Sequence, residues 1–409
     1  MTSRSALEAS GKKFRTQNIS DTVQKIVISP IKEMSILAER VQETNTVSII
    51  SFGQGIPHFD TPDHIKEAIR AALADSDTAK YTLEPGIIEL RMLLAHHLMR
   101  DKNIANVDGR SEVMITVGCQ EAVCCALRSI IDEGDEVLIP SPGFASHSEQ
   151  IIQFGGVPVF VPLNQEDGWS WGMDAVQKSI TSKTRAILFS NPSNPTGAVH
   201  SKEELRFLAD IAIKHYLIII ADETYDFLTY DGAKHTSLGS FADVHDRVIV
   251  CGSFSKKYAM TGYRVGYAYA CEGIIDHMLK VHDALAICAP AISQKGAMQA
   301  LTGPQDNVQN FIDGFSKNRH LLIKELDALS SLFTYAAPKG AYYIFAKYSL
   351  HNIDSFELSL RLLNEAKVVV IPGGAFGPTG EGHLRFSFAG KPDSIHEGFE
   401  RLRTWVQNF

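Results

Sequence analysis

The sequence contains no uninterrupted apolar run of the ~20 residues that a membrane-spanning helix requires. It also lacks an excess of positive charge, since 39 lysines and arginines stand against 47 aspartates and glutamates, for a formal net charge of −8. Proteins that bind nucleic acids carry clustered positive charge, and this chain shows none. We therefore expect neither a membrane nor a nucleic acid as a partner.

Cysteine is scarce, and no pair of cysteines has the spacing typical of a zinc site, so we expect no metal. The cysteines lie mostly in apolar stretches, which favours buried free thiols in a reducing cytoplasm. The polar N-terminus lacks the apolar core of a secretory signal. We expect residues 1–19 to form a flexible arm and the protein to be cytoplasmic. The six cysteines are Cys119, Cys124, Cys125, Cys251, Cys271 and Cys288.

A chain of 409 residues, 44% of them hydrophobic, is long enough for two unequal domains. Short runs rich in Val and Ile, without polar alternation, predict strands that are covered on both faces. The stretch between two of them has a capping box, Ser201 with Glu204, and then Leu205, Leu208 and Ala212 at helical spacing. The strand-like runs are residues 112–116, 136–140, 185–190, 217–221 and 247–252.

Alternation of strands and helices predicts an α/β fold with a mostly parallel, doubly wound sheet. The last ~115 residues differ, because helical segments there alternate with short strands such as GAYYIFA and VVVIPG. We expect a large domain over residues 56–294. A smaller α+β domain is expected to combine residues 20–55 with residues 295–409.

Polar segments follow four of the predicted strands: residues 118–121, 191–197, 222–225 and 253–257. Ligands of such folds bind beyond the carboxyl ends of the strands, so these segments predict one shared site. In the last of them, Lys256 lies beside hydroxyl residues and eight positions before an arginine. This pattern suits a phosphate-bearing aldehyde cofactor, held as an imine by Lys256 and contacted by Ser253, Ser255 and Arg264.

Other residues of these segments suit the same ligand. Asp222 follows an apolar strand, where its carboxylate needs a partner such as a protonated ring nitrogen. Tyr225 and Asn194 can reach a ring oxygen, and Phe144 can stack on the ring. Residues Gly118, Cys119 and Gln120 open a helix, whose N–H groups can hold a phosphate. Each feature also has an ordinary structural explanation: a solvated basic loop, a helix cap, a rigid turn, a helix start or a core aromatic.

These residues belong to motifs that resemble class I/II aminotransferases, the fold-type-I pyridoxal phosphate enzymes, and in particular their broad bacterial and archaeal aspartate/aromatic branch. The motifs keep this order along nearly the whole chain. They are GQGIPHFDTP (53–62), KYTLEPGIIELR (80–91), TVGCQEA (116–122), SPGF (141–144), NPSNPTGAV (191–199), ADETY (221–225), SFSKKYAMTGYRVGY (253–267), PKGAYYIF (338–345) and HLRFSFA (383–389).

The resemblance implies a large domain with a seven-stranded sheet and pyridoxal 5′-phosphate as the cofactor. Lys256 would be the Schiff-base lysine and proton shuttle, and Lys257 would point elsewhere. Arg385 would bind the substrate carboxylate, near Asn194. The first motif would add Gly55 and Ile56 as substrate contacts. The resemblance also implies a homodimer with shared sites, in which Tyr81 reaches the phosphate of the partner subunit.

The implied reaction is ping-pong transfer of an amino group from an α-amino acid to a 2-oxo acid such as 2-oxoglutarate. Relatives that prefer acidic substrates can carry a lysine where this chain has Gln120, and His147 replaces an aromatic residue, so an aromatic, aspartate or neutral donor stays open. Alternative hypotheses are a lyase of the same fold that catalyses C–S β-elimination, or a related enzyme that uses the same cofactor without transamination, and a non-catalytic sensor domain. The sensor domain is disfavoured because the ~50 residues that precede the first motif are not basic.

Overall fold

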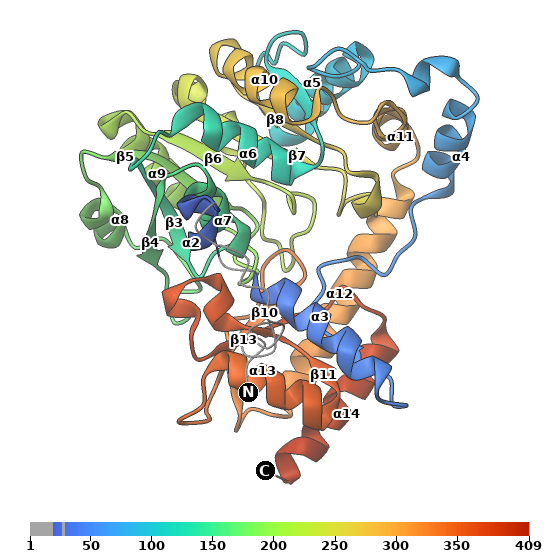
Figure 1. Cartoon of the computed structure of the whole chain (residues 1–409), viewed down its shortest axis with the longest axis vertical. Coiled ribbons are helices and arrows are strands. Elements are labelled where there is room, and N and C mark those ends of the chain that lie inside the picture. The colour runs from blue at the N-terminus through green and yellow to red at the C-terminus, as the bar shows by residue number, and fades with distance from the viewer. Residues whose placement is uncertain (1–18, 27–28, 409) are drawn as a thin grey trace.

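The computed structural model describes residues 19–26 and 29–408. The predicted flexible arm, residues 1–19, lies outside this range except for Ile19, which is exposed. Figure 1 shows an upper part built around the large sheet, where the described chain begins, and a lower part that contains the C-terminal end.

The central sheet of the upper part has seven strands in the order β2-β8-β7-β6-β5-β3-β4. All neighbouring strands from β7 to β4 are parallel, whereas β8 runs antiparallel to both β2 and β7. The expected α/β fold with a mostly parallel seven-stranded sheet is thus confirmed. The strands are β2 (Val113–Thr116), β3 (Glu136–Ser141), β4 (Val157–Pro162), β5 (Thr184–Ser190), β6 (Ile218–Asp222), β7 (Val248–Ser253) and β8 (Gly266–Tyr269).

Helices cover both faces of this sheet, and alternate residues of one strand face opposite layers. Ile187 and Phe189 of β5 belong to the core on one face, whereas Leu188 belongs to the core on the other. Such two-sided burial explains the apolar runs in the sequence. The helices of the upper part are α4 (Asp63–Ala72), α5 (Ile88–Lys102), α6 (Cys119–Ile130), α7 (Ala145–Gln153), α8 (Met173–Ser179), α9 (Lys202–His215), α10 (Glu272–Ala286) and α11 (Ala291–Thr302).

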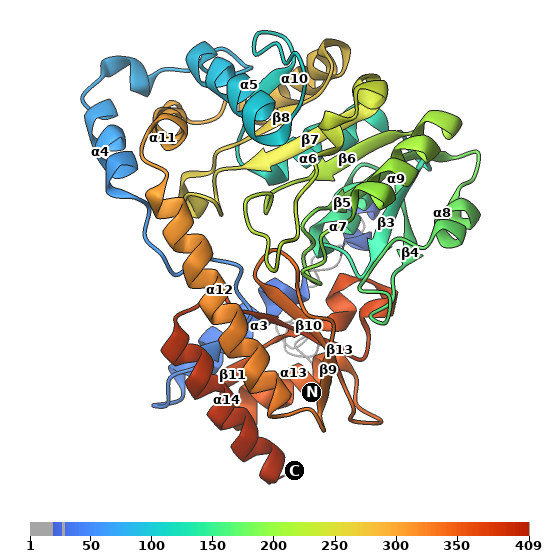
Figure 2. The same ribbon diagram turned by 180° about the vertical axis from the view of Figure 1, so that it is seen from behind.

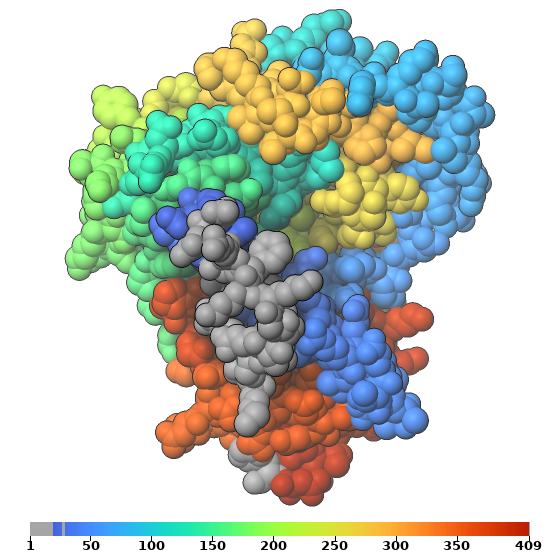
Figure 3. Space-filling model, viewed as in Figure 1, coloured from blue at the N-terminus to red at the C-terminus, as the bar shows by residue number. Residues whose placement is uncertain are grey.

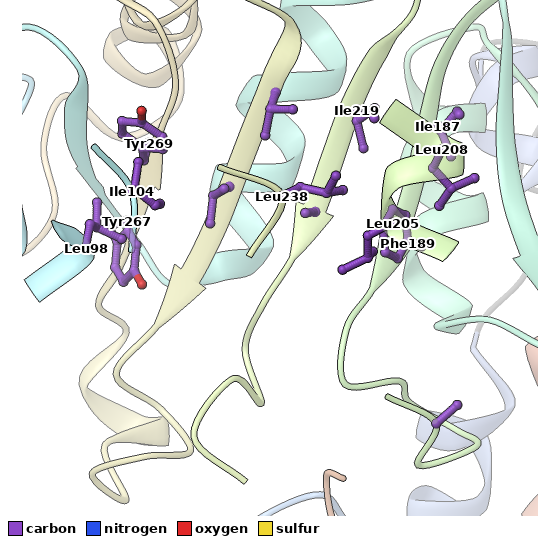
Figure 4. Close-up of a cluster of buried hydrophobic side chains, with 14 of the residues drawn as sticks. Leu98, Ile104, Ile187, Phe189, Leu205, Leu208, Ile219, Leu238, Tyr267 and Tyr269 are labelled. Carbon is purple, nitrogen blue, oxygen red and sulfur yellow. The ribbon is translucent and has the colours of Figure 1, made fainter. Parts of the chain in front are cut away.

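Helix α9 begins as the sequence predicts. The Ser201 hydroxyl accepts a hydrogen bond from the Glu204 amide, and the Glu204 carboxylate accepts one from the Ser201 amide. This capping box fixes the start of the helix and so sets which of its faces meets the sheet. Leu205 and Leu208 are buried and extend toward Phe189 of the sheet (Figure 4).

The lower part has a four-stranded antiparallel sheet, β12-β13-β10-β9, and a parallel pair, β1 and β11. Helix α12 runs from the upper part into the lower part (Figure 2), and α3 lies along the lower surface (Figure 3). The strands are β1 (Ile50–Ser51), β9 (Phe333–Tyr335), β10 (Tyr343–Tyr348), β11 (Val368–Val369), β12 (Ile371–Pro372) and β13 (His383–Ser387). The helices of the lower part are α3 (Pro30–Glu43), α12 (Asp306–Asp327), α13 (Ser355–Arg361) and α14 (Pro392–Gln407), whereas α2 (Asp21–Lys25) packs on α7 of the upper part.

Pairing of β1 with β11 joins the segment near residue 50 to the C-terminal part of the chain. The predicted domain limits themselves stay a prediction. Shorter helical turns connect the main elements: η2 (Ser76–Ala79), η3 (Leu238–Ser240), η4 (Ala242–Arg247), η5 (Thr261–Tyr263), η6 (Leu362–Ala366), η7 (Gly373–Phe376) and η8 (Pro378–Gly380).

None of the helices in the described ranges combines the length and the apolar character needed to cross a bilayer. All six cysteines are free thiols. Cys119, Cys125 and Cys251 are buried, in line with the expectation for most of the cysteines. The other three are only half-buried: Cys124 lies within α6, Cys271 precedes α10, and Cys288 lies between α10 and α11.

Candidate active site

The four polar segments that follow the strands converge on one cavity of about 260 Å³. A single water occupies ~30 Å³ in the liquid, so the cavity has room for a small organic molecule. Predicted site residues that line it are Gly55, Cys119, Gln120, Phe144, Asn194, Asp222, Tyr225, Ser253, Ser255, Lys256, Arg264 and Arg385. Other lining residues are Ile31, Val123, His147, Ser190, Thr224 and Tyr343.

Three predicted site residues do not line this cavity. Gly118 is the residue that precedes α6, and it shapes the turn below. Ile56 is 52% exposed and Tyr81 is 77% exposed, so neither side chain is enclosed by its own chain.

Lys256 lies three residues beyond β7, and its Nζ donates a hydrogen bond of 2.5 Å to the carbonyl of Gly55. Burial, followed by the positive charges of Arg264 and Arg385, lowers the pKa of Lys256 to about 8. A lysine with such a pKa is partly neutral near pH 7.5, and the neutral amine is the form that attacks a carbonyl carbon.

The neighbouring Lys257 has different surroundings and does not line the cavity. Its ammonium group lies 5.6 Å from the centre of the Tyr258 ring. Burial lowers the pKa of Lys257, and the nearby carboxylates Asp226 and Asp101 oppose that effect. Of these two adjacent lysines, only Lys256 presents its amine to the cavity.

Asp222 ends β6 and presents its carboxylate to the cavity. One oxygen accepts hydrogen bonds from the Thr224 amide (3.1 Å) and the Cys119 thiol (3.3 Å). The other oxygen accepts one from Ser190 (3.3 Å) and lies 3.6 Å from Nε2 of His147. Burial alone would raise the pKa of Asp222, but contacts with His147 and Thr224 outweigh burial and lower it. The group is therefore an ionised carboxylate that can pair with a protonated ring nitrogen.

The start of α6, preceded by Gly118 at φ = 80°, forms another wall of the cavity. The amides of Cys119 and Gln120 belong to the first turn, which has no acceptor within its own helix. Arg264 is exposed beside this turn, and a β-carbon at Gly118 would lie 2.4 Å from its Nη2. Free amides next to a guanidinium group form an anion site of the kind that holds a phosphate.

Arg385 lies on β13 and is 2% exposed. Its guanidinium donates to the Asn194 side chain (3.0 Å) and to the Gly53 carbonyl (2.5 Å), and it lies 4.5 Å from the centre of the Tyr343 ring. Its Nε atom is buried without a hydrogen-bond partner, and no carboxylate of the described residues lies within ion-pair distance. A buried cation of this kind can bind the carboxylate of a ligand.

Tyr343 and His147 are among the lining residues to which the sequence assigned no role. The Tyr343 hydroxyl is 2.7 Å from the hydroxyl of Tyr225, and it lies in the PKGAYYIF motif, which was the available signal. His147 contacts Asp222, although in the sequence it stands out only as a departure from the family pattern. In the sequence, His147 follows Phe144 by about one helical turn, and this spacing indicates that the two side chains lie close together. In the structure, their rings pack edge to face with centroids 5.2 Å apart.

The cavity fits pyridoxal 5′-phosphate. It offers an amine of lowered pKa for the aldehyde, an ionised carboxylate for the ring nitrogen and a helix start with an arginine for the phosphate. Arg385 with its unpartnered Nε remains for a substrate carboxylate. Fold and site thus define an enzyme that uses this cofactor on a carboxylate-bearing amine.

Comparison with known proteins gives the same result. The family model "Aminotransferase class I and II" matches residues 47–402. Aromatic-amino-acid aminotransferase 2 of Thermococcus litoralis is 36% identical over 94% of this chain and 97% of its own length. Aspartate aminotransferase of Pyrococcus abyssi has the same identity and coverage.

Solved structures agree. The structure of aspartate aminotransferase from Thermus thermophilus with maleate has a TM-score of 0.89 at 33% identity, over 94% of this chain and 99% of that chain. The aromatic aminotransferase from Pyrococcus horikoshii has a TM-score of 0.85 at 37% identity, over 91% and 99%. The chain belongs to the class I and II aminotransferase family, and it is a pyridoxal phosphate-dependent aminotransferase. These relatives give no support to the lyase alternative.

Proposed function

We propose that Lys256 holds the cofactor covalently and that this enzyme transfers the amino group of an aromatic, acidic or neutral α-amino acid to a 2-oxo acid such as 2-oxoglutarate. The observation that carries the proposal is the shared cavity, in which the amine of Lys256, the carboxylate of Asp222 and the free cation of Arg385 meet. Names of the relatives, which include both aromatic and aspartate aminotransferases, support this range of donors.

Each side chain has a distinct part in holding the cofactor. Asp222 would pair with the ring nitrogen, and Tyr225 and Asn194 would donate to the ring's phenolic oxygen. The ring would stack on Phe144. The phosphate would be held by Ser253, Ser255, Arg264 and the amides of Cys119 and Gln120. When bound, the cofactor supplies an aldehyde that condenses with amines and a ring that accepts electrons from the substrate.

The remaining work falls to residues of the chain. Arg385 binds the carboxylate of the amino acid and thereby orients its Cα toward Lys256. Asn194, which accepts a hydrogen bond from Arg385, keeps the guanidinium in place. Once the amine of the substrate replaces Lys256 on the cofactor, the freed and neutral Nζ would take the proton from Cα as a general base. A lowered pKa keeps a fraction of the amine in that form near neutral pH.

The exposed Tyr81 supports a homodimer with shared active sites. Tyr81, Leu83 and Leu73 are 77%, 76% and 69% exposed and lie within one short segment after α4. Large apolar side chains clustered on a surface are typical of an interface between subunits. We propose that this segment packs on a second copy and that Tyr81 reaches the phosphate of that copy.

The proposed location is the cytoplasm. It is supported by the six free thiols, because a reducing compartment keeps cysteines in this state.

A panel of amino acids tested against 2-oxoglutarate, with glutamate formation as the readout, checks the proposed reaction. We expect glutamate to form with at least one aromatic, acidic or neutral donor, and we expect Lys256→Ala to abolish it. Lys257→Ala is the matched control, because the adjacent lysine lies outside the cavity, and it should keep activity. Release of pyruvate and ammonia from cysteine derivatives, with no amino transfer to any 2-oxo acid, would contradict the proposal.

A further inference from the structure

Glu121 lies in the first turn of α6, and both of its carboxylate oxygens are engaged. Oε2 accepts a hydrogen bond of 2.5 Å from the amide of Val117, the residue before Gly118. Oε1 lies 3.0 Å from Nδ1 of His282, a fully buried side chain on α10. The carboxylate thus connects the segment before α6 to a second helix behind it.

The peptide groups around Val117 link the two halves of the proposed phosphate site. On one side, the Val117 amide is held by Glu121. On the other side, the Val117 carbonyl accepts a hydrogen bond of 3.4 Å from Nη2 of Arg264. The same nitrogen would collide with any side chain at Gly118. A shift of Val117 would therefore move both the turn that starts α6 and the guanidinium that faces it.

A negative charge next to a phosphate site weakens phosphate binding by Coulomb repulsion. Glu121 nevertheless lies there. His282 contacts its Oε1 atom, while its Oε2 atom accepts the hydrogen bond from the Val117 amide. The contact with Val117 fixes the turn before the ligand arrives, which removes an ordering cost from binding. Only ligands that carry a phosphate contact this turn, so only their affinity increases.

We propose that Glu121, braced by His282, is a positioning residue that holds the Val117–Gly118 turn ready for phosphate, and so makes the enzyme select the phosphorylated cofactor over free pyridoxal. This inference rests on the phosphate site assigned under the proposed function. It adds a positioning element that neither touches the cofactor nor takes part in the reaction.

The test compares binding of pyridoxal phosphate and of pyridoxal to the full-length protein after removal of its cofactor, followed by absorbance. Glu121→Ala should weaken binding of the phosphate by roughly 10- to 100-fold, the value of one hydrogen bond to a charged group. Its affinity for pyridoxal should stay at the wild-type value. Glu121→Gln keeps an acceptor for the Val117 amide and should restore most of the lost affinity.

Glu112 offers a matched control, because it has the same pair of contacts at the other end of β2. Its carboxylate accepts from the Asp108 amide (2.8 Å) and lies 2.7 Å from Nε2 of His245. Glu112→Ala should leave the ratio of the two affinities unchanged. The proposal is overturned if Glu121→Ala weakens both ligands equally, or neither, since the brace would then have only a structural role.

Two further outcomes stay distinguishable. If wild-type protein binds pyridoxal phosphate and pyridoxal equally well, the phosphate site itself is misassigned, and the role proposed for Glu121 is wrong as well. If Glu121→Ala does not fold, His282→Ala serves instead, since it removes the side chain that braces the Glu121 carboxylate against Val117. A selective loss for the phosphorylated form supports the brace in that variant, and an unchanged ratio overturns it.

Discussion

The lowered pKa of Lys256 predicts how the protein without its cofactor captures an aldehyde as the pH changes. Only the neutral amine attacks the aldehyde. At pH 7.5, a lysine of pKa 10.5 is neutral in about 0.1% of molecules, whereas a lysine of pKa about 8 is neutral in about 24%. The surroundings of Lys256 therefore raise its reactive fraction by roughly two orders of magnitude at this pH.

The sign follows from the direction of the shift. Because burial and the two arginines lower the pKa, the capture rate should rise with pH, reach half its maximum near pH 8 and then level off. Free pyridoxal is the suitable probe, because its lack of a phosphate keeps the phosphate site out of the measurement. Stopped-flow absorbance of the full-length protein between pH 6 and 11 gives the rates, with Lys256→Ala as the blank.

A variant tests the stated cause. Arg264 is one of the cations that lower this pKa, so Arg264→Met should move the midpoint to higher pH. A wild-type midpoint near 10.5, or a midpoint that Arg264→Met leaves unchanged, would refute the reasoning.

Three further predictions follow from single contacts. Arg385→Ala should lower kcat/KM by an amount equivalent to about 2–5 kcal/mol, because the substrate carboxylate loses its buried partner, and steady-state kinetics check this. Tyr343→Phe removes the 2.7 Å contact with the buried Tyr225 hydroxyl and should lower the free energy of unfolding by about 1 kcal/mol, as measured in urea. Lys102 is 2.7 Å from both Glu223 and Asp226, so Lys102→Met should cost about 3–5 kcal/mol of stability; unfolding at the wild-type urea concentration would contradict this.

Much of the fold could be predicted because local patterns determined it. Each of the five apolar runs became a strand of the sheet, within about one residue, and the Ser201 capping box starts α9. Strands β4 and β8 were missed, since VPVFVP contains two prolines and GYAY contains neither Val nor Ile. Their place in the sheet depends on neighbouring strands rather than on their own sequence.

Some residues of the site could likewise be predicted from local sequence, and others could not. Residues at or shortly beyond the ends of strands, such as Asp222 and Asn194, share a cavity because the carboxyl ends of parallel strands meet at one edge. The contacts of His147 and Tyr343 could not be predicted, because they join segments that are far apart in the sequence. The part proposed for Tyr81 depends on a second subunit, which no single chain can display.

The central claim is that Lys256 carries the cofactor. Its most direct test is borohydride reduction of the purified protein with pyridoxal phosphate, followed by peptide mass spectrometry. We predict one reduced pyridoxal phosphate adduct per chain, on the side chain of Lys256 and not on that of Lys257. An adduct on Lys257, or a fully unlabelled peptide 253–257, would contradict it.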